Sequence, residues 1–159
     1  MLTQAQATAL AGDIDSRPEL AELVEHKDAT LIANFYNELN SPNWMVWKTD
    51  VSVDEIMRNG MDWARVDNLT VGKARIWDWM GRLGSFDASK PNIRAGIDAT
   101  WVGTSADLAV RAVIYTHCKR FATRGEKLFS TGTGSDASPA TMQVEGQLAD
   151  VDIQKAKNW

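Results

Sequence analysis

The stretch 124–148 constrains the fold of this chain more than any other part of the sequence. It reads R-G-E-K-L-F-S-T-G-T-G-S-D-A-S-P-A-T-M-Q-V-E-G-Q-L, and the apolar residues before it recur almost throughout at helical spacing. Within it a helical turn ends, a polar Gly/Ser/Thr loop of about nine residues follows, and Met142 and Val144 then alternate with polar residues as far as Leu148. Because a lone strand cannot satisfy its own backbone donors and acceptors, this strand must pair with another segment.

The rest of the chain has the pattern of short amphipathic helices separated by brief breaks. A residue that commonly caps or opens a helix precedes or begins most of them: Thr3, Pro18, Asp28, Ser52, Asp62, Thr70, Pro91, Thr104, Thr123 and Asp150. The most apolar segment, 106–121, is expected to be the central helix. We predict a mainly α fold, a single helical-bundle domain with a helical body over 1–129. A loop and strand arm over 130–148, with a short β strand or hairpin, and a C-terminal helix over 149–159 complete it.

Composition and charge exclude several classes of protein. The chain of 159 residues has 44% hydrophobic and 24% charged residues, as one globular domain would. A net charge of −4 argues against binding nucleic acid across a broad face. Cys118 is the single cysteine, so an internal disulfide is impossible, which fits a reducing cytoplasm. The first residues lack the pattern of a signal peptide, and no apolar run reaches the roughly 18 residues of a membrane span.

No catalytic, cofactor-binding or metal-binding motif is present. His26 and His117 are far apart, and His117 and Cys118 are adjacent in a helix, so their side chains point about 100° apart. The glycines at 132 and 134 follow a helix and precede a strand without a lysine among them, which is not the order of a phosphate-binding loop. We therefore expect no enzyme activity, no cofactor and no metal ion. A hydrolase built from carboxylates that the fold assembles remains an alternative.

Two further groups of residues bear on the core and the surface of the protein, the seven tryptophans and the basic residues near the loop. Trp77 and Trp101 match the apolar sides of their helices and are expected in the core. Trp79 lies about 200° around the helix from Trp77, so one of these two is expected to be exposed or to meet a neighbour. Trp159 is ordered only if it docks against something. Basic residues gather at Arg111, Lys119, Arg120, Arg124 and Lys127. They form either a solvated face or a patch that docks an acidic partner or lines a path for DNA.

Four strings carry a resemblance to a known family. They are Trp47-Lys48-Thr49, the segment Ala122-Thr123-Arg124-Gly125-Glu126-Lys127-Leu128-Phe129, then Thr131-Gly132-Thr133-Gly134 and Ser138-Pro139-Ala140-Thr141. Together they resemble small proteins encoded in the structural gene clusters of tailed bacteriophages. The block 122–146 carries most of the likeness. The resemblance implies a virion protein of the neck or head–tail connector, or else of the tail or capsid surface.

The leading hypothesis is a non-enzymatic head-to-tail adaptor subunit that bridges the portal and the tail as a ring-shaped homo-oligomer. It would be located in the virion, assembled in the bacterial host cytoplasm, with portal or tail proteins as partners, transient contact with packaged DNA and no membrane. The candidate interface residues are Arg124, Lys127, Phe129, Thr131, Gly132, Gly134, Met142, Val144, Leu148 and Trp159. The strand at 142–148 is expected to pair with another subunit or with the segment 44–48. A phage regulatory or nucleic-acid-binding protein is the second hypothesis.

Overall fold

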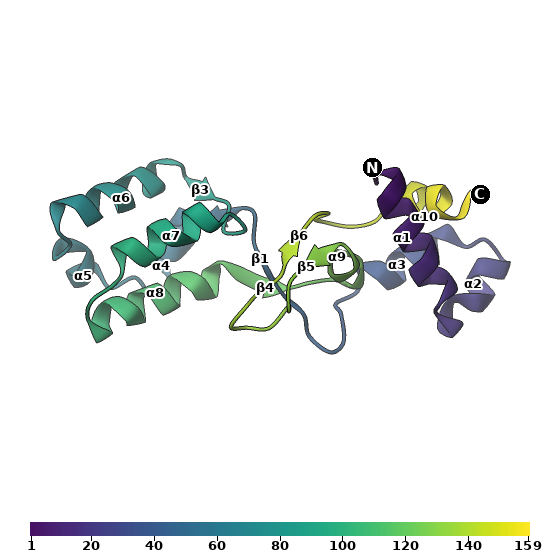
Figure 1. Cartoon of the computed structure of the whole chain (residues 1–159), viewed down its shortest axis with the longest axis horizontal. Helices are drawn as coiled ribbons and strands as arrows, with labels where there is room; N and C mark the ends of the chain where they lie inside the picture. Colours follow the sequence, from purple (N-terminus) through teal and green to yellow (C-terminus); the bar gives the residue numbers. More distant parts are fainter. The chain divides into compact units, whose positions relative to one another are not determined.

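The computed structural model describes all 159 residues, and it confirms a mainly α fold with a polar loop and a short β hairpin near the C-terminal end. Figure 1 shows the elements along the chain. The α-helices are α1 (Gln4–Asp15), α2 (Ala21–Glu25), α3 (Ala29–Asn37), α4 (Val53–Arg58), α5 (Trp63–Asp67), α6 (Val71–Arg82), α7 (Pro91–Thr100), α8 (Ser105–His117), α9 (Arg124–Leu128) and α10 (Asp150–Lys157), with one 3-10 helix, η1 (Pro18–Leu20). No helix is both long and apolar enough to span a bilayer.

The strands are short and form three two-stranded sheets. They are β1 (Met45–Trp47), β2 (Val51–Ser52), β3 (Ser85–Phe86), β4 (Lys119–Phe121), β5 (Ser130–Thr131) and β6 (Thr141–Met142), paired as β1–β4, β2–β3 and β5–β6. The segment around Trp44 to Lys48, which periodicity left undecided, thus contains a strand. The predicted helix over 106–121 is too long. It ends at His117, because the Cys118 carbonyl accepts a hydrogen bond from the Lys48 amide (2.9 Å) and the backbone then extends into β4.

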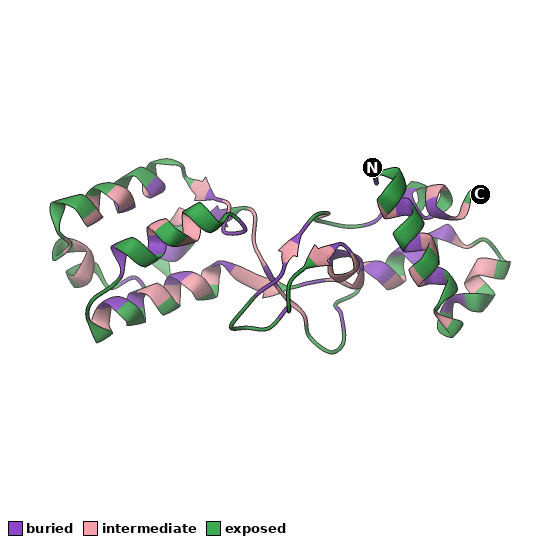
Figure 2. Cartoon of the chain, in the orientation of Figure 1, coloured by how far each residue is buried: buried purple, intermediate pink, exposed green.

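The residues cluster into two compact units. Residues 1–46 and 121–159 form one of them, called here the split unit, and residues 47–120 form the other, the continuous unit. The core of the split unit is formed chiefly by α1, α3 and α10, whose buried stripes are visible in Figure 2. Tyr36, Leu10 and Ile153 are fully buried there. The first and last helices pack together, and the Leu2 amide donates to the Asp152 carboxylate at 3.2 Å.

The helix caps in both units follow from local sequence. Thr3, Thr104 and Thr123 each form a capping box, the last despite the glycine at position 125. Asp28, Ser52 and Asp62 also cap as predicted, and Pro18 and Pro91 occupy first turns. The expected cap at Asp150 is wrong. The helix begins at that residue, with Ala149 as N-cap, and the Ala149 amide donates instead to the Asp152 carboxylate (3.1 Å).

The predicted strand over 142–148 is also wrong beyond its first residue. Strand β6 ends at Met142 and pairs antiparallel with β5, with Ser130 opposite Met142. The backbone then leaves the extended form, since Gly146 has φ +96° and the Leu148 amide and carbonyl both bind the side chain of Asn37 at 2.8 and 2.9 Å. The strand partner therefore lies within the chain. The segment 44–48 contributes through a single parallel bridge between Val46 and Ala140.

The continuous unit contains α4 to α8 and the β2–β3 pair, in which Val51 faces Phe86. Its core includes Trp101, which is 0% exposed, and Ile97 and Ile114. The rings of Trp77 and Trp101 meet edge to face, with their centroids 5.4 Å apart. Both tryptophans predicted for the core are therefore confirmed.

Candidate functional site

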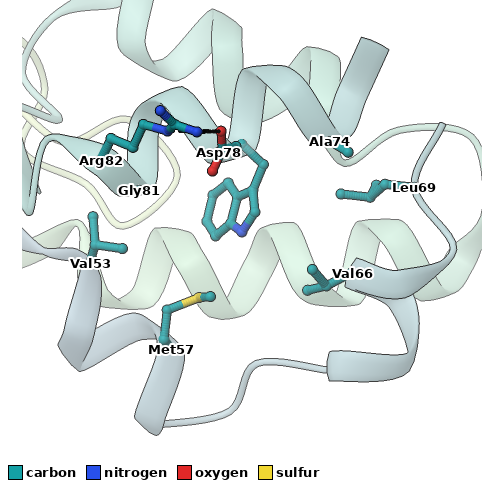
Figure 3. A pocket seen from close by; sticks show the side chains of 9 residues that line it. Val53, Met57, Val66, Leu69, Ala74, Asp78, Gly81 and Arg82 are labelled. Atoms are coloured by element: carbon teal, nitrogen blue, oxygen red, sulfur yellow. Dashed lines mark hydrogen bonds and ion pairs between the residues drawn. The ribbon is translucent and has the colours of Figure 1, made fainter. Parts of the chain in front are cut away.

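The continuous unit has an apolar cavity of about 340 Å³ between α4, α5 and α6. Figure 3 shows side chains from these elements converging on it. The lining residues are Val53, Met57, Val66, Leu69, Ala74, Trp77, Asp78, Gly81 and Arg82. An open apolar cavity with a few polar groups at its edge is the usual form of a binding site in a protein.

The cavity exists because one side of α6 carries small residues. Ala74 and Gly81 are two turns apart, and a Cβ atom added at Gly81 would have no other atom within 4 Å. Trp77, which packs on Trp101, also lines the cavity. At the rim, Arg82 and Asp78 form an ion pair at 2.9 Å, drawn as a dashed line in Figure 3. The site is thus an apolar depression with one charged pair beside it.

Exposed apolar side chains accompany this cavity in the same unit. Trp79 is 64% exposed whereas Trp77 is 6% exposed, so the predicted difference between these two residues is confirmed. Leu83, one helical turn after Trp79, is equally exposed, and Trp63 at the start of α5 is 56% exposed. Helix α6 therefore presents a cavity on one side and a projecting indole and isobutyl group on another.

The structure gathers the candidate interface residues of the sequence analysis within the split unit. Phe129, Met142 and Leu148 are buried there, and Val144 and Trp159 pack against the same core as Leu148. The apolar side chains that an interaction arm would insert into a partner are therefore already packed within the chain.

The polar loop between β5 and β6 is held by Trp44. The Met45 amide donates to the Gly134 carbonyl (2.8 Å), and the Ala140 amide donates to the Met45 carbonyl (2.9 Å). Gly134 has φ +63°, and a Cβ atom there would lie 2.1 Å from the Trp44 ring. The same indole donates from Nε1 to the Ser130 hydroxyl at 3.0 Å.

Glycine at 132 has φ +122° and also packs closely, because a Cβ atom there would lie 3.1 Å from the Ala140 backbone. Thr131 belongs to β5 and faces Thr141. The presence of glycine at 132 and 134, both named as interface candidates, is thus explained within the chain. The loop packs closely on the segment 44–46 and on Ala140.

Arg124 and Lys127 are brought together at a second, polar cavity of about 170 Å³ in the split unit. Its lining residues are Asp13, Arg17, Asn40, Arg124, Lys127 and Leu128. The sequence analysis named two of its three cations and missed Arg17, whose distance along the sequence gave no sign of this proximity. No local pattern could have found this cavity.

Three groups that could perform acid–base or nucleophilic chemistry, Cys118, Asp107 and His117, are buried or bound within the chain. Burial raises the pKa of the Cys118 thiol to about 12, so the thiolate is not accessible near neutral pH. Hydrogen bonds from Arg65 and Thr104 lower the pKa of Asp107, whose carboxylate lies 2.6 Å from the guanidinium of Arg65. The His117 ring contacts the Asn59 carbonyl, with Nε2 2.9 Å from the oxygen. No group of three or more His, Cys, Asp or Glu side chains is placed to hold a metal ion.

Comparisons with known proteins provide no relative from which a function could be transferred. No family model, curated protein or solved structure matches the chain. The apolar cavity of the continuous unit, the polar cavity of the split unit and the sequence resemblance are therefore the bases on which function is argued.

Proposed function

We propose that this chain is a non-enzymatic structural protein that assembles through the apolar surface of its continuous unit. The setting we propose is the bacteriophage virion, assembled in the host cytoplasm, where the chain would be a head-to-tail adaptor subunit. The setting rests on the sequence resemblance carried by 122–129, 131–134 and 138–141. The role in assembly rests on one observation, the open apolar cavity of about 340 Å³ in a unit that also exposes Trp63 and Trp79.

Large apolar side chains left in water favour a protein-binding role. Contiguous exposed apolar surface on a protein commonly marks an interaction site, and tryptophan is enriched among the residues that dominate binding energy at interfaces. The buried and weakly nucleophilic Cys118 and the pairing of Asp54, Asp78 and Asp107 with arginines support a structural rather than a catalytic role.

We take a second copy of the chain as the occupant of the cavity. Trp79 and Leu83 project from another side of the helix that lines it, since Trp79 lies about 200° around α6 from Trp77. A projection on one side and a cavity on another give a head-to-tail contact, which either closes into a ring or continues as a filament.

Filling the cavity from within tests this assembly. In Gly81→Leu the new side chain would occupy space that is empty of neighbouring atoms, and removing a helix-interior glycine should stabilise α6 by up to about 1 kcal/mol. We expect the native chain to show a mass that rises with concentration in analytical ultracentrifugation and the variant to stay monomeric with an unchanged or higher Tm. Gly12→Leu is the matched control, because Gly12 is also inside a helix with open space around it, and it should assemble like the native chain. A native chain that remains monomeric at the highest soluble concentration would refute assembly through this surface.

The virion setting has its own test. Cross-linking of purified particles followed by mass spectrometry should recover peptides of this chain joined to a second copy and to a portal or tail protein. Particles produced with Gly81→Leu should lack tails. If the chain is missing from purified particles, the adaptor role is excluded, whatever its state of assembly in solution.

A further inference from the structure

We infer that the polar cavity of the split unit binds a phosphate group, inorganic or as a monoester. The cavity is formed by α1, by Arg17 two residues after it, by Asn40 after α3, and by α9. Three of its six lining side chains are cations, Arg17, Arg124 and Lys127, and Asp13 is the one carboxylate. This inference is independent of the proposed function, which concerns the other unit.

Both guanidinium groups are held in place before any ligand arrives. Arg17 donates from Nε to Asp13 at 2.7 Å, and the Tyr36 hydroxyl donates to the same carboxylate oxygen at 2.5 Å. The hydrogen bond to Asp13 raises the pKa of Arg17, so its charge is permanent. Arg124 donates from Nη1 to the Phe35 carbonyl at 2.7 Å. Ordering these side chains would therefore cost little free energy when a ligand binds.

The two guanidinium groups also share one aromatic ring. The guanidinium carbon of Arg17 lies 5.4 Å from the centroid of Phe35, and that of Arg124 lies 4.1 Å from it. The shared contact with Phe35 and the shared cavity place two cationic groups in one region of the split unit, where a bound anion would meet positive charge. This arrangement explains why a ligand of negative charge suits the cavity.

Lys127 provides the donors that are still available. Its ammonium group lies 5.1 Å from the centroid of the Trp44 ring, and that contact uses the charge without occupying the N–H donors. No hydrogen bond or ion pair to a carboxylate engages this ammonium within the chain. Lys127 is thus the side chain that a bound anion would engage first.

The carboxylates near the cavity reduce its positive electrostatic potential without removing it. Glu38 pairs with Arg124 at 2.7 Å and Glu19 pairs with Arg17 at 3.3 Å, but their side chains are 67% and 50% exposed. Exposed pairs of this kind contribute little, because water and salt screen them. We expect a ligand to displace Glu38 from Arg124 rather than to displace the better buried Asp13 from Arg17.

The size of the cavity and the directions of its hydrogen-bond donors favour phosphate as the ligand. A cavity of about 170 Å³ admits one charged group and not a run of nucleotides, so it does not suit the backbone of DNA. The cations come from three separate positions, after α1 and at both ends of α9, and the tetrahedral oxygens of a phosphate can accept from several directions.

Titration with inorganic phosphate at constant ionic strength tests the inference. Amide resonances in NMR should shift saturably at Arg17, Arg124 and Lys127, and Lys127→Gln should weaken the affinity about tenfold, as expected for loss of one charge-assisted contact. Lys27→Gln is the control, because Lys27 is an exposed lysine of the same unit outside the cavity, and it should bind within about twofold of the native chain. Lys127→Arg should retain binding, which separates loss of charge from loss of fold.

A comparison of ligands and a comparison of variants complete the test. O-phosphoserine that binds more tightly than inorganic phosphate would assign the site to a monoester, and the reverse order would assign it to free phosphate. Equal affinity of the native chain, Lys127→Gln and Lys27→Gln would overturn the inference, as would a shift that rises linearly with phosphate and equally with chloride. Gly81→Leu should leave phosphate binding unchanged, so failure here and failure of the proposed assembly are distinguishable.

Discussion

The two units treat their apolar surface differently. The split unit covers its core with segments from both parts of the chain, and its loop at 130–140 is fixed on Trp44 by hydrogen bonds and by the close approach of Gly134. The continuous unit leaves a cavity beside α6 and exposes two indoles, those of Trp63 and Trp79. The conspicuous glycine loop thus makes its contacts within the chain, whereas helix α6, whose sequence has no unusual motif, borders an open apolar cavity.

The largest effect should come from truncating the buried tryptophan of the continuous unit. Trp101→Ala removes a fully buried ring that packs on Trp77 and should lower the free energy of unfolding by about 3–5 kcal/mol. Trp79→Ala should change it by less than about 0.5 kcal/mol, because that ring is already in water. Denaturant titration followed by circular dichroism measures both values.

Hydrogen exchange of Trp101→Ala then tests whether the two units unfold independently. Loss of protection confined to 47–120 would sharpen the distinction between the units. Equal loss in 1–46 and 121–159 would show that the two units unfold as one body.

A smaller effect is expected in the split unit at the glycine on Trp44. Gly134→Ala combines a positive φ with overlap against the Trp44 ring, so we expect a loss of about 2–4 kcal/mol and release of the loop. Gly146→Ala shares the positive φ but meets no neighbouring atom, and it should cost about 1–2 kcal/mol. Equal losses in the two variants would mean that the loop does not depend on Trp44.

The last expected effect, which is absent below pH 9, is the response of the continuous unit to alkaline pH. Because burial raises the pKa of Cys118 from 9.0 to about 12, the contribution of this group is fully present below pH 9 and is lost as pH rises toward 12. Native protein at pH 8 should react with a thiol reagent only as fast as the continuous unit opens. Rapid labelling without denaturant would show that Cys118 is not enclosed, and Cys118→Ala should remove this pH dependence of stability.

Local chemistry made part of the fold predictable. The N-caps at Thr3, Thr104 and Thr123 bind residues only three positions away, so the sequence alone predicts these caps. The burial of Trp77 and the exposure of Trp79 follow from helical periodicity in the same way.

The features that the sequence did not predict depend on contacts between residues far apart along the chain. The strand predicted as far as Leu148 is cut short because Asn37, more than a hundred positions away, binds the Leu148 backbone. The division into two units and the meeting of Arg17 with Lys127 are likewise set by tertiary packing. The apolar cavity did leave a signal, the small residues Ala74 and Gly81 on the side of α6 that carries Trp77, but small residues on a helix have many causes.

The divided sequence of the split unit has a consequence for synthesis on the ribosome. Residues 47–120 are complete before 121–159 have been made, so the continuous unit can fold while α1 and α3 still lack α10. During that interval the apolar faces around Leu10 and Ile32 are open to other nascent chains and to chaperones. Helices α1 and α3, which are made before the continuous unit, can therefore complete their packing only after it.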